Sequence, residues 1–407
     1  MSGWPTASLS RLAADEPSSI SKPYGSAIYK DDYTTQGIPV VRGVNLARGV
    51  FHDDDFVFIS PALAAKMPGA QLKAGDLVFT HRGTVGQVSM VPRSPRHERY
   101  VASTSQVKVR LDAKNAVPEF YYYWFTSEMG QQSILENIST VGVPGLVQPV
   151  ATIKRLAVPV PPLREQQAIA EVLGALDDKI AANTQLAAAA EALAEAAFQH
   201  WLVTTETRES ALAEVATVVL GGTPDRSRLD FWTDGTVAWL NSGKVNENRI
   251  LEPSELITQQ ALDASAAKLM PRGATLIAIT GATLGQIARL EIEASGNQSI
   301  VGIWSGSAAM NAWLHFAIKY KLPDLLSRAT GAAQQHVNKK DVEFLGIPML
   351  EGNVETFGNE VVPLLDVARA ADLENLWLAS TRDVLLPQLM SGKLRVKDAE
   401  ALVAETV

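Results

Sequence analysis

Cysteine is absent from this 407-residue sequence. Disulfides, thiolate nucleophiles and Cys-ligated zinc or iron–sulfur centres are therefore excluded. No uninterrupted apolar stretch approaches the roughly 18 residues that a membrane-spanning helix needs, and the N-terminus lacks a basic region followed by an apolar one. We therefore expect a soluble, cytoplasmic protein with no membrane partner.

The short motifs of common catalytic and cofactor sites are also absent. There is no G-x-x-x-x-G-K-[ST] loop, no G-x-G-x-x-G after a strand, no H-E-x-x-H and no G-x-S-x-G. The six histidines show no spacing suited to a metal, and the acidic run at 53–55 is typical of a solvated loop. We predict a non-catalytic chain without cofactor or metal. A nuclease with scattered carboxylates is the alternative.

The composition is that of a globular protein, with 46% hydrophobic and 20% charged residues. The length predicts two or three domains, each able to bury a substantial core. The formal net charge of −8 divides into +3 over residues 1–160, −4 over 161–204, −5 over 205–360 and −2 over 361–407. DNA-binding domains are usually basic, so net charge neither supports nor excludes a DNA partner.

Two halves of the sequence repeat the same segments in the same order. GTVGQV at 83–88 returns as ATLGQI at 282–287, and the flanks repeat as well. The further pairs are GIPVVRGVNL (37–46) with GTVAWLNSGKV (235–245), KAGDLVF (73–79) with PRGATLI (271–277), TSQVKVRL (104–111) with NQSIVGIW (297–304), FYYYWFTSEM (120–129) with NAWLHFAIKY (311–320), and LAVPVP (156–161) with LGIPML (345–350). Gly turns before short β-prone runs, with aromatic helix-like stretches, predict one mixed α/β domain built twice.

Each half ends in a segment whose residues follow the alternating four-and-three spacing of a coiled-coil seam. The first segment opens at Pro161 and Pro162, and its seam is Ile169, Leu173, Leu176, Ile180, Asn183, Ala187, Ala190, Ala194, Ala197 and Trp201. The second seam, 188 positions later, is Phe357, Val361, Leu364, Ala368, Ala371, Asn375, Leu378, Arg382, Leu385 and Leu389. Pro363 predicts that the second helix begins there, and Pro387 predicts that it ends or kinks there.

We predict an α+β fold that is internally duplicated, with two mixed α/β domains separated by two long antiparallel coiled-coil helices. The expected boundaries are 1–160 for the first domain, 161–204 for the first helix, 205–355 for the second domain, and 356–407 for the second helix and tail. Core helices of a single domain are the alternative, but a helix over 163–203 would be about 60 Å long. Asn183 and Asn375 either fix the helix register or face a partner.

Four stretches point to a known family: VPVPPLREQQAIAEVLGALDDKIAANTQLAAAAEALAEAAFQHWLV at 158–203, RDVLLPQLMSGKLRV at 382–396, GGTPDRSRLDFWTDGTVAWLNSG at 221–243, and the paired RGTVG (82–86) and GATLG (281–285). With these stretches the sequence resembles the specificity subunit of type I restriction-modification enzymes over nearly its whole length. The first half departs from the family pattern, because SKPYGSA at 21–27 stands in place of G-G-T-P.

The resemblance implies two target recognition domains, each reading one half of a bipartite, asymmetric site in double-stranded DNA. It implies that the helices set the spacer and dock two methyltransferase subunits, with two restriction/translocase subunits in the full complex. S-adenosylmethionine, ATP and magnesium would then lie on the partners, and the complex would serve anti-phage defence. Two alternatives remain: a protein-interaction scaffold that reads no DNA, and the reader of a related anti-phage system without modification.

The repeated turns are expected to project main-chain N–H groups and a Thr hydroxyl toward phosphates, while nearby polar side chains read base edges. In the first half the candidates are Arg42, His81, Arg82, Thr84, Gln87, Ser105 and Gln106. In the second half they are Asn241, Lys244, Thr280, Thr283, Gln286, Asn297 and Gln298, together with Gln335, Asn338, Lys339 and Lys340 of QQHVNKK at 334–340. For each, a turn residue that caps its own strand is the alternative.

Helix pairing and partner docking are assigned to the residues of the two seams and their ends. These are Ile169, Leu173, Leu176, Ile180, Asn183, Trp201, Val361, Leu364, Asn375, Leu378 and Leu385.

The first helix carries a near-repeat of four residues, LAAAAEALAEAA at 186–197. One added unit lengthens a helix by about 6 Å, or one to two base pairs at about 3.4 Å each. Inserting Ala-Glu-Ala-Leu after Leu193 is therefore expected to widen the spacer of the DNA target and leave both half-sites unchanged. Mapping the methylated target before and after the insertion tests this, and altered half-site bases would contradict it.

Overall fold

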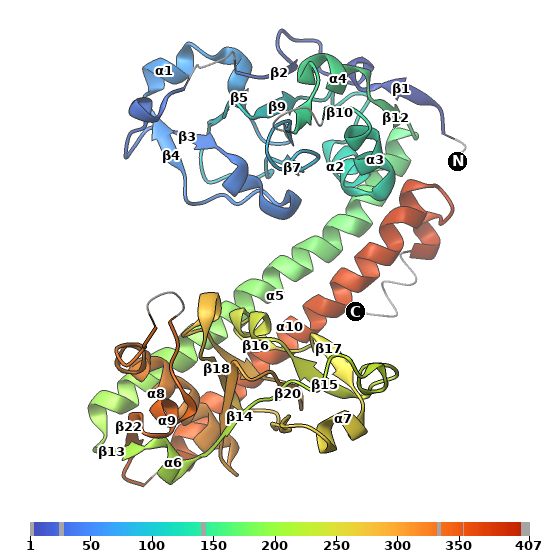
Figure 1. The fold of residues 1–407 in the computed structure, drawn as a ribbon. Helices are drawn as coiled ribbons and strands as arrows, with labels where there is room; N and C mark the ends of the chain where they lie inside the picture. The colour runs from blue at the N-terminus through green and yellow to red at the C-terminus, as the bar shows by residue number, and fades with distance from the viewer. Residues whose placement is uncertain (1–3, 24–27, 140–143, 332–334, 353, 400–407) are drawn as a thin grey trace. The chain divides into compact units, whose positions relative to one another are not determined.

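The computed structural model describes residues 4–23, 28–139, 144–331, 335–352 and 354–399 (Figure 1). They fall into two compact units. Unit 1 consists of Met1–Ile180 and Trp377–Val407, and unit 2 consists of Ala181–Leu376. Two long helices, α5 (Leu163–Thr204) and α10 (Val354–Met390), each contribute residues to both units.

The first domain, in unit 1, contains two four-stranded sheets. One has the order β2 (Ile20–Ser21), β9 (Gln106–Val109), β6 (Leu77–Thr80), β7 (Val88–Met90). The other has the order β4 (Val57–Ile59), β3 (Ile38–Val41), β8 (Tyr100–Ala102), β5 (Gln71–Leu72). Two antiparallel pairs complete the strands, β1 (Thr6–Ser8) with β12 (Ala157–Pro159) and β10 (Ile138–Ser139) with β11 (Gly145–Leu146). The α-helices are α1 (Pro61–Ala65), α2 (Pro118–Thr126), α3 (Glu128–Leu135) and α4 (Pro149–Arg155).

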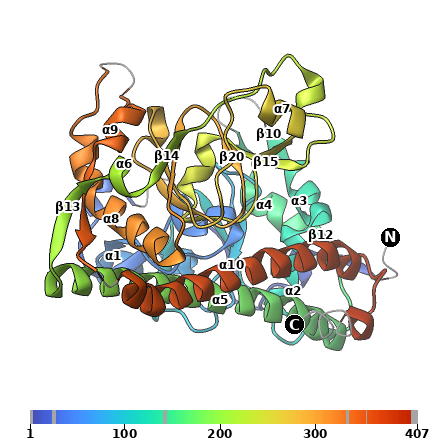
Figure 2. The ribbon, with the colours of Figure 1, turned by 90° about the horizontal axis from the view of Figure 1, so that it is seen from below.

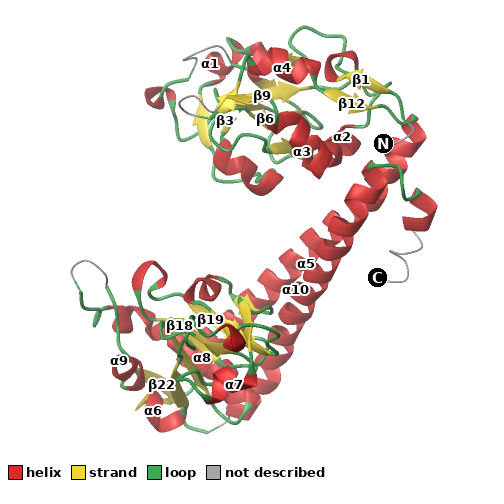
Figure 3. Ribbon diagram, turned by 45° about the vertical axis from the view of Figure 1, so that its right-hand side comes forward, coloured by secondary structure: helices red, strands yellow, loops and turns green. Residues whose placement is uncertain are grey.

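The second domain, in unit 2, repeats this plan. A five-stranded sheet has the order β14 (Thr217–Leu220), β21 (Ile300–Trp304), β18 (Thr275–Ala278), β19 (Ile287–Leu290), β16 (Arg249–Ile250). A three-stranded sheet has the order β17 (Glu255–Ile257), β15 (Val237–Leu240), β20 (Ser295–Gly296), and β13 (Thr207–Ala211) pairs with β22 (Gly346–Leu350). The helices, red in Figure 3, are α6 (Leu212–Val215), α7 (Gln259–Asp263), α8 (Ala308–Leu326) and α9 (Lys339–Glu343).

Strand pairing confirms the predicted duplication. The order β2-β9-β6-β7 matches β14-β21-β18-β19, and the parallel pair of β3 with β8 matches that of β15 with β20. A side-chain hydrogen bond to a proline carbonyl also recurs in both domains, although the donor is a tyrosine in one and a tryptophan in the other. The Tyr121 hydroxyl donates to the Pro159 carbonyl at 3.0 Å, and Trp313 Nε1 donates to the Pro348 carbonyl at 2.8 Å. Each domain therefore holds the proline of its last strand through an aromatic side chain of a helix.

The main core of each domain includes residues of the long helices. In unit 1, Phe79 and Phe120 belong to one buried cluster with Leu173 of α5 and Leu385 of α10. In unit 2, the corresponding cluster joins Trp313 to helix residues, which include Phe198 of α5 and Phe357 of α10. Burying each such side chain contributes about 1.5–3 kcal/mol, so each domain and its helix segments stabilise one another.

Helices α5 and α10 pair antiparallel within each unit, as predicted. In unit 1, Arg382 Nη1 donates to Asp177 Oδ1 at 2.8 Å. In unit 2, Trp201 Nε1 donates to Glu360 Oε2 at 2.8 Å. Asn183 of α5 also donates to Glu374 of α10 in unit 2, so within that unit a residue later in α5 meets a residue earlier in α10. Figures 1 and 2 show α5 and α10 side by side in this unit.

The expected seam positions of α5 are buried, apart from Ile180 and Trp201, which are partly buried. In α10 the buried residue is Leu365, whereas Leu364, the expected one, is only partly buried. The shift is local, because Leu365 packs in the second main core and the next buried positions, Ala368 and Ala371, are again the expected ones. The buried seam residues of α10 are Phe357, Val361, Leu365, Ala368, Ala371, Leu378, Leu385 and Leu389.

Two asparagines make polar contacts across the helix pair in unit 2. Asn183 Nδ2 donates to Glu374 Oε2 at 2.7 Å, and Asn375 Nδ2 donates to Thr184 Oγ1 at 3.1 Å. They lie beside an apolar contact made of small side chains, Ala187, Ala190, Ala368 and Ala371. The asparagines are thus paired across the seam in this structure.

The prediction that α10 begins at Pro363 was wrong, because the helix already starts at Val354. Phe357 and Val361 are buried in the second core, and only a helical backbone places both of them there. Their burial outweighs the cost of about 3 kcal/mol for an internal proline. Pro387 also lies inside the helix, which ends at Met390 before Gly392 with φ +67°.

Replacing Pro363 with Ala is expected to stabilise the chain by about 1–3 kcal/mol, because it restores a helical N–H group and removes a clash with the preceding turn. The thermal unfolding midpoint measures the effect. Pro387→Ala is the matched control, with a smaller gain because it lies in the last turn. An unchanged or lower midpoint for Pro363→Ala would show that the proline is not a source of strain in α10.

Candidate nucleic-acid interface

In the first domain, three connections meet at one edge of the sheets. They follow β3, follow β6, and join β8 to β9. Ser103 N donates to the Val41 carbonyl at 3.0 Å, and His81 N donates to the Ser105 carbonyl at 2.9 Å. The strand ends that carry Arg42, His81 and Ser105 are thereby joined, so these predicted candidates share an edge.

The second domain joins the equivalent connections. Asn297 N donates to the Leu240 carbonyl at 2.9 Å, which places the β20–β21 turn beside Asn241. Thr280 Oγ1 donates to Ser299 Oγ at 2.7 Å. Gly281 N also donates to the Gln335 carbonyl at 3.2 Å, which brings in the segment before α9. Most of the predicted candidates of the second half therefore come from one group of adjoining loops.

The repeated phrase forms the turn between two antiparallel strands in each half, β6 to β7 and β18 to β19. Gly86 and Gly285 have φ values of +94° and +83°, a backbone conformation that favours glycine. Val85 and Leu284 pack partly buried against the two main cores. The repeated sequence is therefore explained by one type of turn, which has the same backbone conformation in both halves and one apolar residue packed against the core.

The expectation that these turns offer free N–H groups to phosphate was wrong for four amides. Val85 N and Gln87 N donate to the carbonyls of Gly83 and Thr84 at 2.9 and 3.3 Å. In the second half, the amides of residues 284 and 286 donate to the carbonyls of residues 281 and 283 at 3.1 and 2.9 Å. Turn formation consumes these donors, so contact with DNA depends on side chains and on other backbone groups.

A groove of about 570 Å³ lies over this edge of the first domain. It is lined by the residues Arg42, Gly43, Val44, Ala47, Thr84 and Gln87. Thr84 Oγ1 donates to Gln87 Oε1 at 2.9 Å, so the Gln87 amide group can still donate outward. A groove with both amide donors and exposed apolar groups suits base edges, because the thymine methyl needs an apolar contact.

His81 supports these loops from inside. Its side chain is 5% exposed, and its Nε2 lies 3.0 Å from the Thr104 carbonyl. Burial lowers the pKa of His81, the Thr104 carbonyl raises it, and the charges of Lys22 and Arg82 lower it again, for a net fall. The ring is therefore uncharged at neutral pH. Lys22 escaped sequence reasoning, although it belongs to the SKP stretch at 21–23 that stands where the second half has G-G-T-P.

The predicted candidates differ in accessibility. Gln106 is 0% exposed and accepts a hydrogen bond from Ser103 Oγ, so like His81 it supports the edge from beneath. The partly buried residues are Arg42, Gln87, Ser105, Lys244, Thr280, Thr283, Asn297 and Lys339. The exposed residues are Arg82, Thr84, Asn241, Gln286, Gln298, Gln335, Asn338 and Lys340. Gln334 lies outside the described residues.

Some of the candidates have local roles. Asn241 Oδ1 accepts from Gly243 N at 2.9 Å, and Asn338 Oδ1 accepts from Asp341 N at 3.0 Å, so both cap short helices. Lys339 Nζ lies 2.9 Å from Glu343 Oε1. These are the capping and turn roles that sequence reasoning held open as alternatives.

The G-G-T-P turn is part of the second edge, a role that sequence reasoning missed. Thr223 Oγ1 donates to Gln298 Oε1 at 2.6 Å, and Gly222 N donates to the Gly296 carbonyl at 2.8 Å. A Cβ atom at Gly221 would lie only 2.3 Å from the Asn297 carbonyl oxygen. Glycine is thus required for the backbone to approach the β20–β21 turn this closely.

Among the residues that the structure describes, no group of three or more His, Cys, Asp or Glu side chains could hold a metal ion. Within the same residues, no helix is long and apolar enough to cross a membrane.

Residues 24–192 and 205–349 match a protein family described as the type I restriction modification DNA specificity domain. The chain belongs to this family. It contains the specificity domain twice, and each match covers one of the two edges described above. The chain is thus a type I restriction-modification specificity protein with two DNA specificity domains.

Similar proteins agree with this assignment. The Escherichia coli EcoR124I/EcoR124II specificity subunit is 22% identical over 166 residues, so the alignment spans 40% of this chain and two-fifths of that subunit. The putative MjaX specificity subunit of Methanocaldococcus jannaschii is 21% identical over 356 residues, 80% of each chain. The crystal structure of the S subunit from M. genitalium matches the fold with a TM-score of 0.62 at 15% identity, covering 95% of this chain and 96% of that one.

Gly221→Ala is expected to destabilise the second specificity domain by about 1–3 kcal/mol, because the added Cβ overlaps the backbone of the β20–β21 turn. Urea-induced unfolding followed by Trp fluorescence measures the loss. Gly306→Ala is the matched control, since nothing lies within 4 Å of a Cβ there. Equal stability of the two variants would show that the close approach at Gly221 is unimportant.

Proposed function

We propose that each specificity domain reads one half of a bipartite, asymmetric site in double-stranded DNA through the edge described above. The observation that carries this proposal is the repetition of the edge. Both domains bring the same three connections together and present exposed amide, hydroxyl and cationic side chains there. Amides and hydroxyls discriminate bases in the grooves, and cations contact phosphates.

The two edges use different side chains in equivalent loops. The first has Lys22, Arg82 and the groove beside Arg42, whereas the second has Thr223 with Gln298 and Gln335. Different side chains on one backbone plan are what two unlike half-sites require. The target is therefore expected to be asymmetric.

In this proposal, α5 and α10 set the number of unread base pairs between the half-sites and dock the partner subunits. Exposed apolar residues on the helices support a docking role, among them Leu186 and Leu193 of α5 and Val384 of α10. Two methyltransferase subunits would bind, and two restriction/translocase subunits would join the full complex. Catalysis, S-adenosylmethionine, ATP and magnesium would belong to those partners.

The direct test is to co-express the chain with the methyltransferase subunit from its own genome and to map N6-methyladenine across the host DNA. We expect one bipartite, asymmetric motif that disappears when this chain is omitted. A stable complex that methylates no motif would contradict the proposal and would favour a scaffold that reads no DNA.

Gln298→Ala is expected to relax base preference in one half-site only, at a cost of about 1–3 kcal/mol, because Gln298 belongs to a single edge. Methylation of a library of randomised half-sites measures this. Gln260→Ala is the matched control, because Gln260 is exposed on α7 and lies away from the edge. Helix α7 follows β17, whose last residue pairs with the start of β15, whereas the edge lies at the end of β15. Changes in both half-sites, or none, would remove Gln298 from base reading.

Arg82→Ala is expected to weaken binding evenly across sequences, because an exposed arginine at the edge is placed for phosphate contact. The slope of log affinity against log salt should fall by about 1. Binding of the methyltransferase complex to its target at several salt concentrations measures it. A change in sequence preference with an unaltered slope would instead make Arg82 a base-reading residue.

A further inference from the structure

The second specificity domain contains two large apolar clusters, and they differ in their relation to the helices. One cluster includes Phe198 of α5 and Phe357 of α10. The other includes Leu240, Ile250 and Ala278, and among the described residues it contains none from either long helix. Leu240 directly precedes Asn241 at the candidate edge. Among the described residues, this cluster, which lies next to the candidate DNA-binding loops, is therefore not attached to the long helices by apolar packing.

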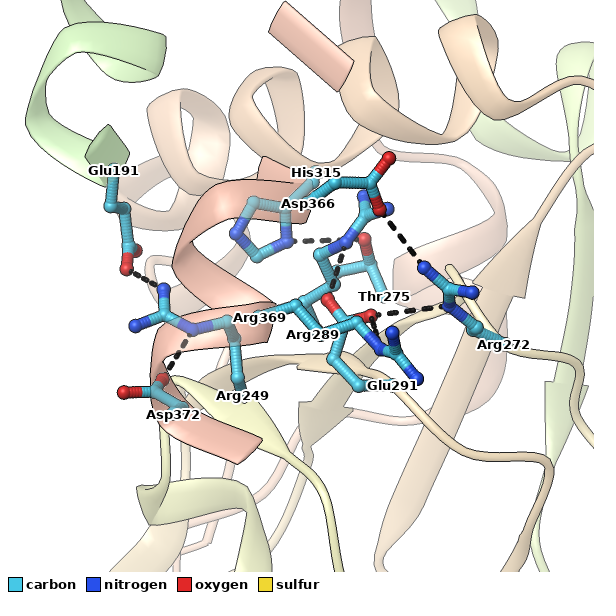
Figure 4. A network of polar contacts seen from close by, with 10 residues as sticks. All are labelled: Glu191, Arg249, Arg272, Thr275, Arg289, Glu291, His315, Asp366, Arg369 and Asp372. Atoms are coloured by element: carbon cyan, nitrogen blue, oxygen red, sulfur yellow. Dashed lines mark hydrogen bonds and ion pairs between the residues drawn. The ribbon is translucent and has the colours of Figure 1, made fainter. Parts of the chain in front are cut away.

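Ion pairs make that attachment instead (Figure 4). Arg249, on the outer strand β16, lies between Glu191 of α5 and Asp372 of α10. Its Nε donates to Asp372 Oδ2 at 2.7 Å, and its Nη1 donates to Glu191. The Arg249 side chain is 8% exposed. The guanidinium of Arg249 therefore joins the sheet to both helices. Ile250, the next residue, is buried in the apolar cluster that, among the described residues, includes none from either long helix.

The environment of Arg249 favours its positively charged form. Burial acts to lower the pKa of Arg249, but the hydrogen bond that it donates to Asp372 and the charges of Asp372 and Glu191 outweigh this effect and raise the pKa. Lys319 of α8 also lies 3.7 Å from Glu191 Oε1, so this carboxylate has a second cation nearby. If Arg249 alone were replaced, Lys319 would thus still partly neutralise the charge of Glu191.

A second group of ion pairs involves the adjoining strand β19, the loop after it and the turn before β18. Arg289 Nε donates to Glu291 Oε1 at 2.8 Å, and Glu291 is almost completely buried. Arg369 of α10 approaches Glu291 Oε2 at 3.6 Å. Arg272 Nη2 donates to Asp366 Oδ1 of α10 at 2.9 Å. The same sheet is thus tied to α10 at two further positions.

The first domain has different residues at the equivalent positions. Leu77 pairs with Met90 where Thr275 pairs with Arg289, so Met90 is the counterpart of Arg289. By the same register, Ala74 is the counterpart of Arg272. A cavity of about 600 Å³, lined in part by Met90, Tyr123, Gly174 and Asp177, lies at this junction. The ion pairs of Arg289 and Arg272 are therefore a feature of the second half, beyond what the duplication requires.

We propose that Arg249 is a positioning residue that fixes the angle of the second specificity domain on the helix pair and thereby restricts the complex to one spacer length. The inference rests on the proposed function. On α10, Asp372 lies about 10 Å beyond Leu365 at 1.5 Å per residue. The ionic contacts at Asp366 and Arg369 lie nearer to Leu365, so the contact at Asp372 is the outermost of the attachments to α10 and resists rotation of the sheet most strongly.

The test uses the full chain co-expressed with the methyltransferase subunit from its own genome. Plasmids carry the native half-sites separated by the native spacer, or by one or two base pairs more or fewer. Wild type should methylate the native spacing alone. Arg249→Met should raise methylation at neighbouring spacings, relative to the native one, by about tenfold, a change that corresponds to about 1.4 kcal/mol. Both half-site sequences should stay unchanged.

Three further variants separate positioning from general stability. The double variant Glu191→Gln with Asp372→Asn keeps the side-chain volumes and should relax the spacing as Arg249→Met does. Arg249→Lys should give an intermediate result, because an ammonium lacks the fork that reaches two carboxylates. Arg226→Met is the matched control, since Arg226 binds Glu255 with two bonds of 2.7 and 2.8 Å inside the domain. It should not relax the spacing.

An unchanged spacing profile in folded Arg249→Met, or an equal fall in methylation at every spacing, would overturn the inference. If Arg249→Met fails to fold, the double variant decides by the same criteria. A wild-type complex that methylates no bipartite motif would instead overturn the proposed function, which the spacing data alone cannot do.

Discussion

Burial of the apolar faces of α5 and α10 serves two purposes at once, because the helix residues that face each other also complete the main core of a specificity domain. Leu173 packs in one such core and Phe357 in the other. Neither main core is complete without residues from the long helices. Stability and the placement of the recognition loops are consequently governed by the same contacts, and a substitution in the seam is expected to alter both.

Polar contacts fix the alignment of the two helices along this apolar seam. Small side chains such as Ala187 and Ala371 allow close packing but distinguish poorly between registers, whereas Asn183 with Glu374 accepts only one alignment. Arg249 extends the same principle from the helix pair to the sheet above it, since its two carboxylates stand on different helices. Buried charges are weak sources of net stability, so a role in geometry explains their presence better than a role in stability.

The sequence was sufficient for the large features, because periodicity and repetition are visible without coordinates. The spacing from Ile169 to Trp201 predicted α5, and the paired phrases predicted the duplication. Local rules failed where tertiary packing was stronger: Pro363 lies inside a helix because Phe357 and Val361 are buried before it. Gln106 and His81 look like surface polar residues in a turn, yet both are buried beneath it. Lys22 and Thr223 were missed because nothing in the local sequence shows which turns fold next to one another.

The pairing of each domain's first and last strands also bears on how such chains diversify. β1 lies antiparallel to β12, which immediately precedes α5, and β13 immediately follows α5 and lies antiparallel to β22. The chain therefore enters and leaves each domain at neighbouring positions on a single two-stranded ribbon. A recombination event with breakpoints in these ribbons would replace a whole domain as a cassette and leave the helices unchanged. Exchange of genetic material between related chains could thus produce new combinations of half-sites without redesign of the framework that carries them.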